Sequence, residues 1–261
     1  MSCKTMKTLF MFVMLLFIAS PLSAIQKDRS LLNVIERNSL LVGMDVAELP
    51  WIKRNLKIAQ YEGFEYEIVK LIAQKLDVKL VIVNTKWSKL PEALLTKKID
   101  IIVNAYSPAN VGKEMVAKIF WSEPYYHWGW AIAVSADDNS INGISDLKGK
   151  VVGCFTDAKE YFSKIDGIKE LKVYPRAAYD KLLAGEIDAF IYDSPSVYYT
   201  VKTDPRLKVA GPLIESTQTY NIGFRAKDEA LRKKIESILH DILESPEYKA
   251  IMNKWLGVVE K

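Results

Sequence analysis

The chain has 261 residues, 49% of them hydrophobic and 26% charged, an ordinary globular composition that excludes a disordered or fibrous protein. Its formal net charge is only +4, and its basic residues are scattered along the sequence, so nucleic acid is not an expected partner.

The first 24 residues have the pattern of a secretory signal peptide. Lys4 and Lys7 form a basic start, residues 9–19 are an unbroken apolar stretch, and the segment ends in the small residue Ala24. The apolar stretch is too short to span a bilayer comfortably. We therefore predict cleavage near Ala24 and release into a bacterial periplasm, in preference to an uncleaved N-terminal anchor helix.

The two cysteines point to an exported protein without an internal disulfide. Cys3 precedes the apolar stretch, so the mature chain would keep Cys154 alone. The fold must then depend on a large apolar core. Because Cys154 follows Gly153 within a predicted strand, we expect a buried, inert thiol and not a nucleophile.

Strands alternate with helices along the rest of the chain, in two consecutive series. The first series predicts strands over 41–46, 80–83 and 99–103 and helices over 63–76 and 90–98. The second predicts strands over 150–155, 171–174 and 187–192 and helices over 158–164 and 178–184. Two further helices are expected over 228–245 and 247–256, separated at Pro246. This alternation indicates a parallel sheet with right-handed crossovers.

The two series share a short phrase. Leu94-Leu95 followed by Ile99-Asp100 returns as Leu182-Leu183 followed by Ile187-Asp188, at a constant offset (182 − 94 = 88). Matches this short also arise by chance, but their place in two similar series favours two related α/β lobes over a single sheet.

Sequence motifs for catalysis are missing. The sequence contains no G-x-S-x-G elbow, no phosphate-binding loop and no G-x-G-x-x-G after a strand. His127 and His240 are the only imidazoles and lie far apart in the sequence. We therefore expect no enzyme, no metal and no cofactor.

Aromatic residues crowd into the segment 121–130, which holds Trp121, Tyr125, Tyr126, Trp128 and Trp130. Packing in the core and between lobes explains most of them. Others can wall a cleft beyond the carboxyl ends of the strands, since ligand pockets combine aromatic surfaces with a few polar groups.

Several segments between Leu41 and Leu256 together carry a family resemblance. In chain order they are Gly43-Met44-Asp45 with Pro50-Trp51, Gly63-Phe64-Glu65, Trp87 to Asp100, Trp121 to Tyr126, Asp146 to Gly153, and Tyr248 to Trp255. Each is weak alone, but their order and spacing are specific. The chain resembles bacterial periplasmic solute-binding proteins of the family that serves polar amino acid importers.

The resemblance implies a type II periplasmic binding protein fold, in which two similar α/β lobes joined by two hinge strands close over a small ligand. Lobe 1 would comprise residues 25–132 and 220–261, and lobe 2 residues 133–219, with crossings near 131–135 and 220–225. The implied function is the substrate-binding component of an ABC importer. Such a protein, expected to be a monomer, passes a small polar amino-acid-like or amine solute to an inner-membrane permease.

The resemblance also implies where the ligand binds. The candidate contacts are Asp45, Glu48, Trp87, Tyr106, Ser107, Lys113, Asp157 and Asp193. Asp193 aligns with the family's acid that grips the ligand's ammonium group, although an N-cap role fits it equally well, as it does Asp157.

The resemblance fails at the family's Thr-x-Thr-x-x-Arg segment, which holds the ligand's α-carboxylate. Here residues 107–113 keep only the Ser107 hydroxyl, and the arginine is absent. Lys113 can substitute only as a point charge, and a surface role is its alternative. Acids facing aromatic walls without a fixed cation would make a ligand carboxylate costly to bury.

We therefore expect the pocket to favour a small amine, or another cationic or neutral polar solute, over a standard α-amino acid. Two other functions stay open at this point. One is a periplasmic enzyme of the same fold, similar to cyclohexadienyl dehydratases. The other is a sensory or accessory receptor that reports solute occupancy to a partner.

Overall fold

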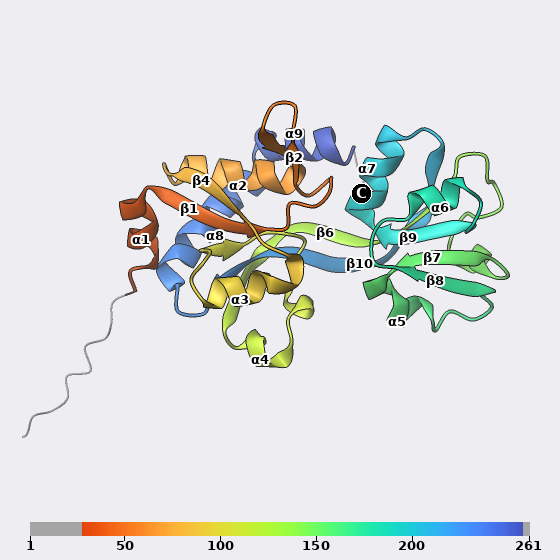
Figure 1. Ribbon diagram of the computed structural model, residues 1–261, viewed down its shortest axis with the longest axis horizontal. Coiled ribbons are helices and arrows are strands. Elements are labelled where there is room, and N and C mark those ends of the chain that lie inside the picture. Colours follow the sequence, from red (N-terminus) through yellow and green to blue (C-terminus); the bar gives the residue numbers. More distant parts are fainter. Residues whose placement is uncertain (1–27, 258–261) are drawn as a thin grey trace, which may run out of the picture.

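The computed structural model describes residues 28–257, so the predicted signal peptide and its cleavage point near Ala24 lie outside the described residues. The described chain forms an eight-stranded mixed sheet flanked by helices (Figure 1). The strand order across this sheet is β4-β1-β5-β10-β6-β9-β7-β8, and β2 pairs with β3 as a separate hairpin.

The strands have these bounds: β1 Ser39–Met44, β2 Lys53–Asn55, β3 Gln60–Glu62, β4 Lys79–Asn84, β5 Ile101–Ile102, β6 Ile119–Ser135, β7 Val151–Phe155, β8 Glu170–Tyr174, β9 Ala189–Asp193 and β10 Leu207–Arg225. The α-helices have these bounds: α1 Ser30–Arg37, α2 Phe64–Lys75, α3 Leu90–Leu95, α4 Lys113–Val116, α5 Lys159–Phe162, α6 Tyr179–Leu183, α7 Ser194–Thr203, α8 Glu229–Leu243 and α9 Pro246–Trp255. Short 3₁₀ turns are η1 Trp87–Lys89, η2 Pro108–Asn110, η3 Ile144–Leu147 and η4 Thr156–Ala158.

Two long antiparallel strands, β6 and β10, belong to both halves of the molecule. β10 pairs with β5 through Gly223 and Phe224, whereas β6 pairs with β9 through residues 130–133. Parallel strands β5, β1 and β4 lie on the first side, and β9, β7 and β8 on the second. The fold is therefore the predicted one, two similar α/β lobes joined by two hinge strands. The predicted lobe divisions, after residues 132 and 219, fall within β6 and β10.

The repeated sequence phrase marks the same joint in each lobe. Asp100 Oδ2 accepts a hydrogen bond from Leu41 N at 2.8 Å, and Asp100 N donates to Leu41 O at 2.8 Å. In the second lobe Asp188 makes the same pair of bonds with Val151, at 2.7 and 2.8 Å. Each aspartate thus fixes the start of β5 or β9 against the first strand of its own lobe, which supports a common origin for the two series.

The predicted elements of both series are all present, and their ends shift by three residues at most. The apolar pattern does not predict α1, α4 or the β2–β3 hairpin. Each of these elements is short and lies largely at the surface, so it lacks the periodic buried face on which such predictions depend.

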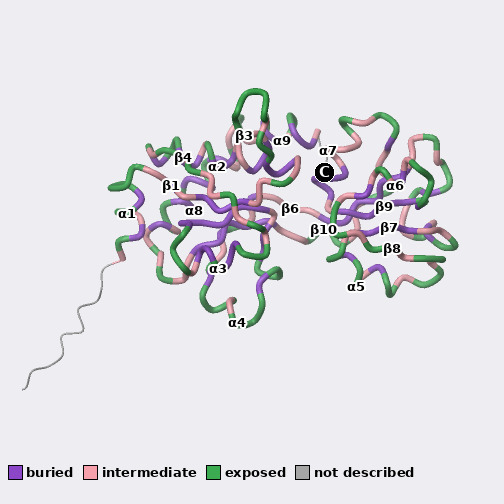
Figure 2. Tube along the Cα trace, viewed as in Figure 1, coloured by how far each residue is buried: buried purple, intermediate pink, exposed green. Residues whose placement is uncertain are grey.

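The apolar stripe predicted for the C-terminal helix is buried. α8 contacts α2 and α9, and Figure 2 shows the buried positions concentrated along the strands and the helix faces that cover them. The buried residues of α8 are Leu231, Ile235, Ile238, Leu239 and Ile242. Burial of one such side chain contributes about 1.5–3 kcal/mol, so this face alone is a large part of the first lobe's core.

Cys154 is the buried, free thiol that the sequence predicts, and burial raises its pKa to about 11. Among the described residues, no helix has both the length and the apolar character needed to cross a bilayer.

Gly63 joins the hairpin to α2 in a conformation that is almost restricted to glycine. Its φ and ψ are 137° and 156°, and an added Cβ would lie 2.1 Å from the Trp51 carbonyl oxygen. We expect Gly63→Ala to lower the free energy of unfolding by about 2–4 kcal/mol, because backbone strain and atomic overlap each cost about 1–3 kcal/mol.

Urea denaturation measures this difference. Gly143→Ala is the matched control, because nothing lies within 4 Å of an added Cβ there and its backbone is extended. Equal stabilities for the two variants would contradict the assignment of strain to Gly63.

Candidate functional site

The carboxyl ends of the parallel strands in both lobes face one common gap. β10 returns to the first lobe antiparallel to β5, and β6 enters the second lobe antiparallel to β9. Both β5 and β9 must therefore run toward the junction of the lobes, and β1 and β7 run parallel to them. Ligands of open α/β sheets bind beyond such ends, so the residues that follow these strands are the candidates.

Asp193 ends β9, and its side chain turns toward the hinge strands. It stands at the N-cap position of α7 but makes no capping hydrogen bond. Its Oδ2 accepts a hydrogen bond from the Tyr220 hydroxyl at 2.6 Å, whereas Oδ1 is buried without a partner among the described residues. Burial raises the pKa of Asp193 to about 7, and the charges of Glu48 and Asp157 act in the same direction. The free oxygen can accept a hydrogen bond from a cationic group.

Glu48 joins the two lobes. This residue of the first lobe accepts a hydrogen bond at 3.2 Å from the hydroxyl of Tyr192, which lies in β9 of the second. The rings of Trp51 and Tyr192 meet edge to face, with centroids 6.0 Å apart. Burial raises the pKa of Glu48, against the opposing effects of Tyr192 and of the cations Arg176 and Lys53. The lobes are thus in contact at the rim of the gap.

Glu65, at the start of α2, is the most deeply buried acid of this region and was not among the predicted contacts. Its Oε1 accepts hydrogen bonds from Ala105 N at 2.6 Å and from the Tyr125 hydroxyl at 2.5 Å, while Asn104 Nδ2 lies 3.5 Å from Oε2. Burial raises its pKa to about 7, and the charge of Asp193 contributes to this shift. The charge of Asp193, in the second lobe, therefore acts on Glu65, in the first.

Asp157 lies in η4, just beyond the end of β7. Its side chain reaches solvent, yet the surrounding protein desolvates it enough to raise its pKa. Its charge raises the pKa values of Asp193 and of Tyr106, so it faces the same gap. Among the described residues no three His, Cys, Asp or Glu side chains gather closely enough to hold a metal ion.

Asp45, Trp87 and Tyr106 form a rigid unit on the first lobe. Asp45 Oδ2 accepts from Trp87 N at 2.8 Å, and the Tyr106 hydroxyl donates to Trp87 O at 3.0 Å. The two rings stack with centroids 4.3 Å apart, and Trp87 Nε1 donates to Asn104 O at 3.0 Å. These bonds occupy the polar groups of the unit, which leaves the partly exposed Trp87 ring as a surface for stacking.

Ser107 and Lys113 lie further along the same loop. The Ser107 hydroxyl accepts from Ala109 N at 3.3 Å and pairs with Asn110 Oδ1 at 2.9 Å, which caps η2. Lys113 begins α4 and is exposed. Glu48 and Asp157 are among the charges that raise the pKa of Asp193, whereas Lys113 is not among the main charges that act on Glu48, Asp157 or Asp193.

Sequence analysis missed the hydroxyl donors Tyr125, Tyr192 and Tyr220 as well as Glu65. One signal existed, because Glu65 stands in the Gly-Phe-Glu segment used for the resemblance. Tyr125, Tyr192 and Tyr220 lie 60, 144 and 27 positions from the acids that they contact, so only the folded chain pairs them.

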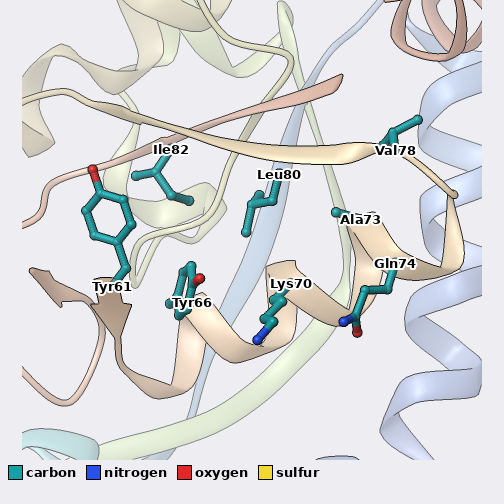
Figure 3. A pocket seen from close by; sticks show the side chains of 8 residues that line it. All are labelled: Tyr61, Tyr66, Lys70, Ala73, Gln74, Val78, Leu80 and Ile82. Carbon is teal, nitrogen blue, oxygen red and sulfur yellow. The ribbon is translucent and has the colours of Figure 1, made fainter. Parts of the chain in front are cut away.

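A groove of about 270 Å³ lies elsewhere, between α2 and the edge strand β4 (Figure 3). Tyr61, Tyr66 and Lys70 stand along one side of it, and Leu80 and Ile82 along the other. None of the acids of the inter-lobe gap lines this groove, so it is separate from the candidate site.

Comparisons with known proteins agree with this architecture. Residues 40–258 match the family described as bacterial extracellular solute-binding proteins, family 3. The L-cystine-binding protein TcyJ of Escherichia coli (strain K12) is 29% identical over 238 residues, covering 88% of this chain and 87% of the relative. A probable amino-acid ABC transporter-binding protein of Haemophilus influenzae is 28% identical, covering 86% and 87%. The structure of an ancestral arginine-binding protein bound to arginine is 27% identical, with a TM-score of 0.67, covering 85% and 99%.

The raised pKa of Asp193 predicts a pH-dependent stability. The buried carboxyl stays protonated in the folded chain up to about pH 7, whereas in the unfolded chain it ionises near its usual pKa of 3.8. The protonated carboxyl therefore contributes fully to the free energy of unfolding below pH 3.8. This contribution is lost as the pH rises to about 7, at up to about 1.4 kcal/mol per pH unit. We expect Asp193→Asn to gain stability relative to the wild type across this range.

Urea denaturation of the ligand-free protein between pH 4.5 and 7.5 measures the slope, and altered hydrogen bonding adds only a constant offset. Asp166→Asn, at an exposed position, is the control and should leave the slope unchanged. Parallel pH profiles for the wild type and Asp193→Asn would rule out a buried, proton-binding carboxyl.

Proposed function

The chain belongs to family 3 of the bacterial extracellular solute-binding proteins, and we propose that it captures its solute by closing two lobes around it. It is the substrate-binding component of an ABC importer and takes a small polar solute, amino-acid-like or amine. We place it in the periplasm as a monomer that delivers the solute to a permease in the inner membrane. The amino-acid-binding names of its relatives support this assignment.

The proposal of an amine-bearing solute rests on the acids that lie on both sides of the gap. Glu48 and Glu65 come from the first lobe, and Asp157 and Asp193 from the second. Each has a raised pKa, which means that the protein alone does not compensate its negative charge fully. An ammonium group between the lobes would supply that compensation, with Asp193 Oδ1 as its first hydrogen-bond acceptor.

Closure is the mechanism that the rim contacts support. The Tyr192–Glu48 hydrogen bond and the Trp51–Tyr192 ring contact each join one lobe to the other. Both must break when the lobes separate. A cationic solute would neutralise the acids of the gap and so remove their mutual repulsion, which would favour the closed state.

Two amine-bearing solute types are suggested by the relatives' names. TcyJ binds L-cystine and the ancestral protein binds arginine, and both ligands carry ammonium groups. We propose that this chain recognises the ammonium end of its solute and tolerates the lack of an α-carboxylate. Lys113 is exposed and is not among the main charges that act on Glu48 or Asp193, which supports this preference.

We propose that binding is the whole activity and that the chain is not an enzyme. The relatives named above are binding proteins, and the acids of the gap have hydroxyl partners but no described imidazole among them. Incubation with prephenate or arogenate, followed by absorbance, tests the dehydratase alternative. Turnover of either compound would reject the non-enzymatic function.

Isothermal calorimetry with two matched pairs of probes tests the solute class. L-arginine is compared with agmatine, and L-cystine with cystamine, since each second compound is the first without its carboxylates. We expect at least one probe to bind and the amine of that pair to bind at least as tightly. Asp193→Asn should weaken binding about 10- to 100-fold, because a charge-assisted hydrogen bond contributes about 1.5–3 kcal/mol.

Lys113→Gln is the matched control and should leave the affinity unchanged. Tight binding of L-arginine or L-cystine that requires Lys113, with much weaker binding of the amines, would reject the preference for an amine. Even in that case, loss of binding in Asp193→Asn would show that the solute binds in the gap between the lobes.

A proton should leave the protein when a cationic probe binds below pH 7. The probe favours the ionised forms of Asp193 and Glu65, whose pKa values are both about 7 in the free protein. Affinity should therefore increase from pH 5.5 to pH 8. Calorimetry below pH 7 in phosphate and in MES, buffers with different ionisation enthalpies, measures the released proton, and identical heats in both would contradict the coupling.

A further inference from the structure

The turn of the β2–β3 hairpin carries the two most exposed large apolar side chains of the described residues. Leu56 is 84% exposed and Ile58 is 58% exposed. Figure 2 shows this turn as an exposed loop that stands out from the body of the first lobe. Both side chains stay exposed to water although a buried core lies close by. Such exposed apolar groups are typical of a surface that contacts a membrane or another protein.

Positive charge is concentrated around these side chains. Lys53, Arg54 and Lys57 lie in β2 and the turn, whereas the single acid of the hairpin, Glu62, lies at its base, where it pairs with Lys53 across the two strands. All three are exposed, and none forms an ion pair with a described residue. The chain as a whole is nearly balanced, with 36 basic and 32 acidic residues, so this local excess is a distinct feature of the hairpin.

The hairpin is held firmly at its base. Trp51 and Ile52 are buried, and Phe64 N donates to Pro50 O at 2.8 Å. In the turn, Lys57 N donates to Asn55 Oδ1 at 3.0 Å, which gives the backbone a defined bend. The apolar tip is therefore presented by a structured support, and its exposure does not result from a loose chain end.

The hairpin also stands beside the gap between the lobes. It begins directly after Glu48 and Trp51, the two residues that touch Tyr192 of the second lobe. In the proposed function the solute leaves through this gap, so delivery to a permease would turn this side of the molecule toward the membrane. The tip is then among the parts of the first lobe that come near the bilayer.

We propose that the β2–β3 hairpin is a membrane-contact element whose Leu56 and Ile58 dip into the interface of a bilayer rich in anionic phospholipid. Two aliphatic side chains flanked by cations are the composition of interfacial anchors. The footprint is far below the roughly 800 Å² per partner of a stable protein interface, whereas a lipid surface requires no complementary shape. Each cation near an anionic surface would strengthen association about fivefold.

Vesicle co-sedimentation of the mature protein tests the proposal. The vesicles are phosphatidylcholine alone or phosphatidylcholine with about one-third phosphatidylglycerol. We expect at least tenfold stronger association with the anionic vesicles and its loss at high salt. Leu56→Ser/Ile58→Ser and Arg54→Gln/Lys57→Gln should each reduce association about tenfold or more.

Two matched variants serve as controls. Leu32→Ser/Ile35→Ser removes two other exposed apolar side chains, and Lys227→Gln/Lys249→Gln removes two other exposed cations. Both should associate like the wild type. Solute binding measured by calorimetry should be unchanged in the hairpin variants, so failure of the membrane contact remains distinguishable from failure of the solute-binding function.

Labelling gives a second, independent measurement. Leu56→Cys carrying an environment-sensitive fluorophore should shift to the blue on anionic vesicles, whereas a label at Leu32→Cys should not. Cys154 is buried and will not take the label. Absence of the shift, equal association with both kinds of vesicle, or hairpin variants that associate like the wild type would overturn the proposal and leave an acidic protein surface as the remaining partner.

Discussion

The antiparallel pairing of β6 with β10 is the constraint on which the other features of this protein depend. Both strands pass through both lobes, so the direction of each fixes the direction of every strand hydrogen-bonded beyond it. As a result β1 and β5 on one side, and β7 and β9 on the other, end at the same gap. Residues that lie more than a hundred positions apart in sequence thereby become neighbours, as Glu48 and Tyr192 do.

The gap between the lobes contains several acids close together, an arrangement that costs stability and is not expected of a junction with a structural role alone. Glu65 and Asp193 each have a pKa of about 7, mainly because burial disfavours their ionised forms. Tyrosine hydroxyls from β6 and β10 offset part of this cost by donating to both carboxylates. The cationic solute that we propose would relieve the remaining cost, and this would link the stability of the empty protein to its affinity for that solute.

The first lobe divides its tasks between a fixed and an exposed part. Asp45, Trp87 and Tyr106 are locked together by hydrogen bonds and stacking, so that one aromatic surface keeps its position. The hairpin that follows Trp51 is anchored just as firmly but extends its apolar tip into solvent. The two roles that we propose for this lobe, solute binding and membrane contact, would therefore use separate surfaces.

Periodic burial and local turn chemistry depend on consecutive residues, so the two strand–helix series, the repeat and the buried stripe of α8 could be predicted from the sequence. The family resemblance also implied Asp193 as a ligand contact, because it aligns with the family's acid that grips the ammonium group. The folded chain was needed to show that Asp193 makes no capping bond and instead accepts from Tyr220, and that Glu65 lies close enough for the charge of Asp193 to act on it. Those outcomes depend on distances between segments remote in the chain, and no local pattern encodes them.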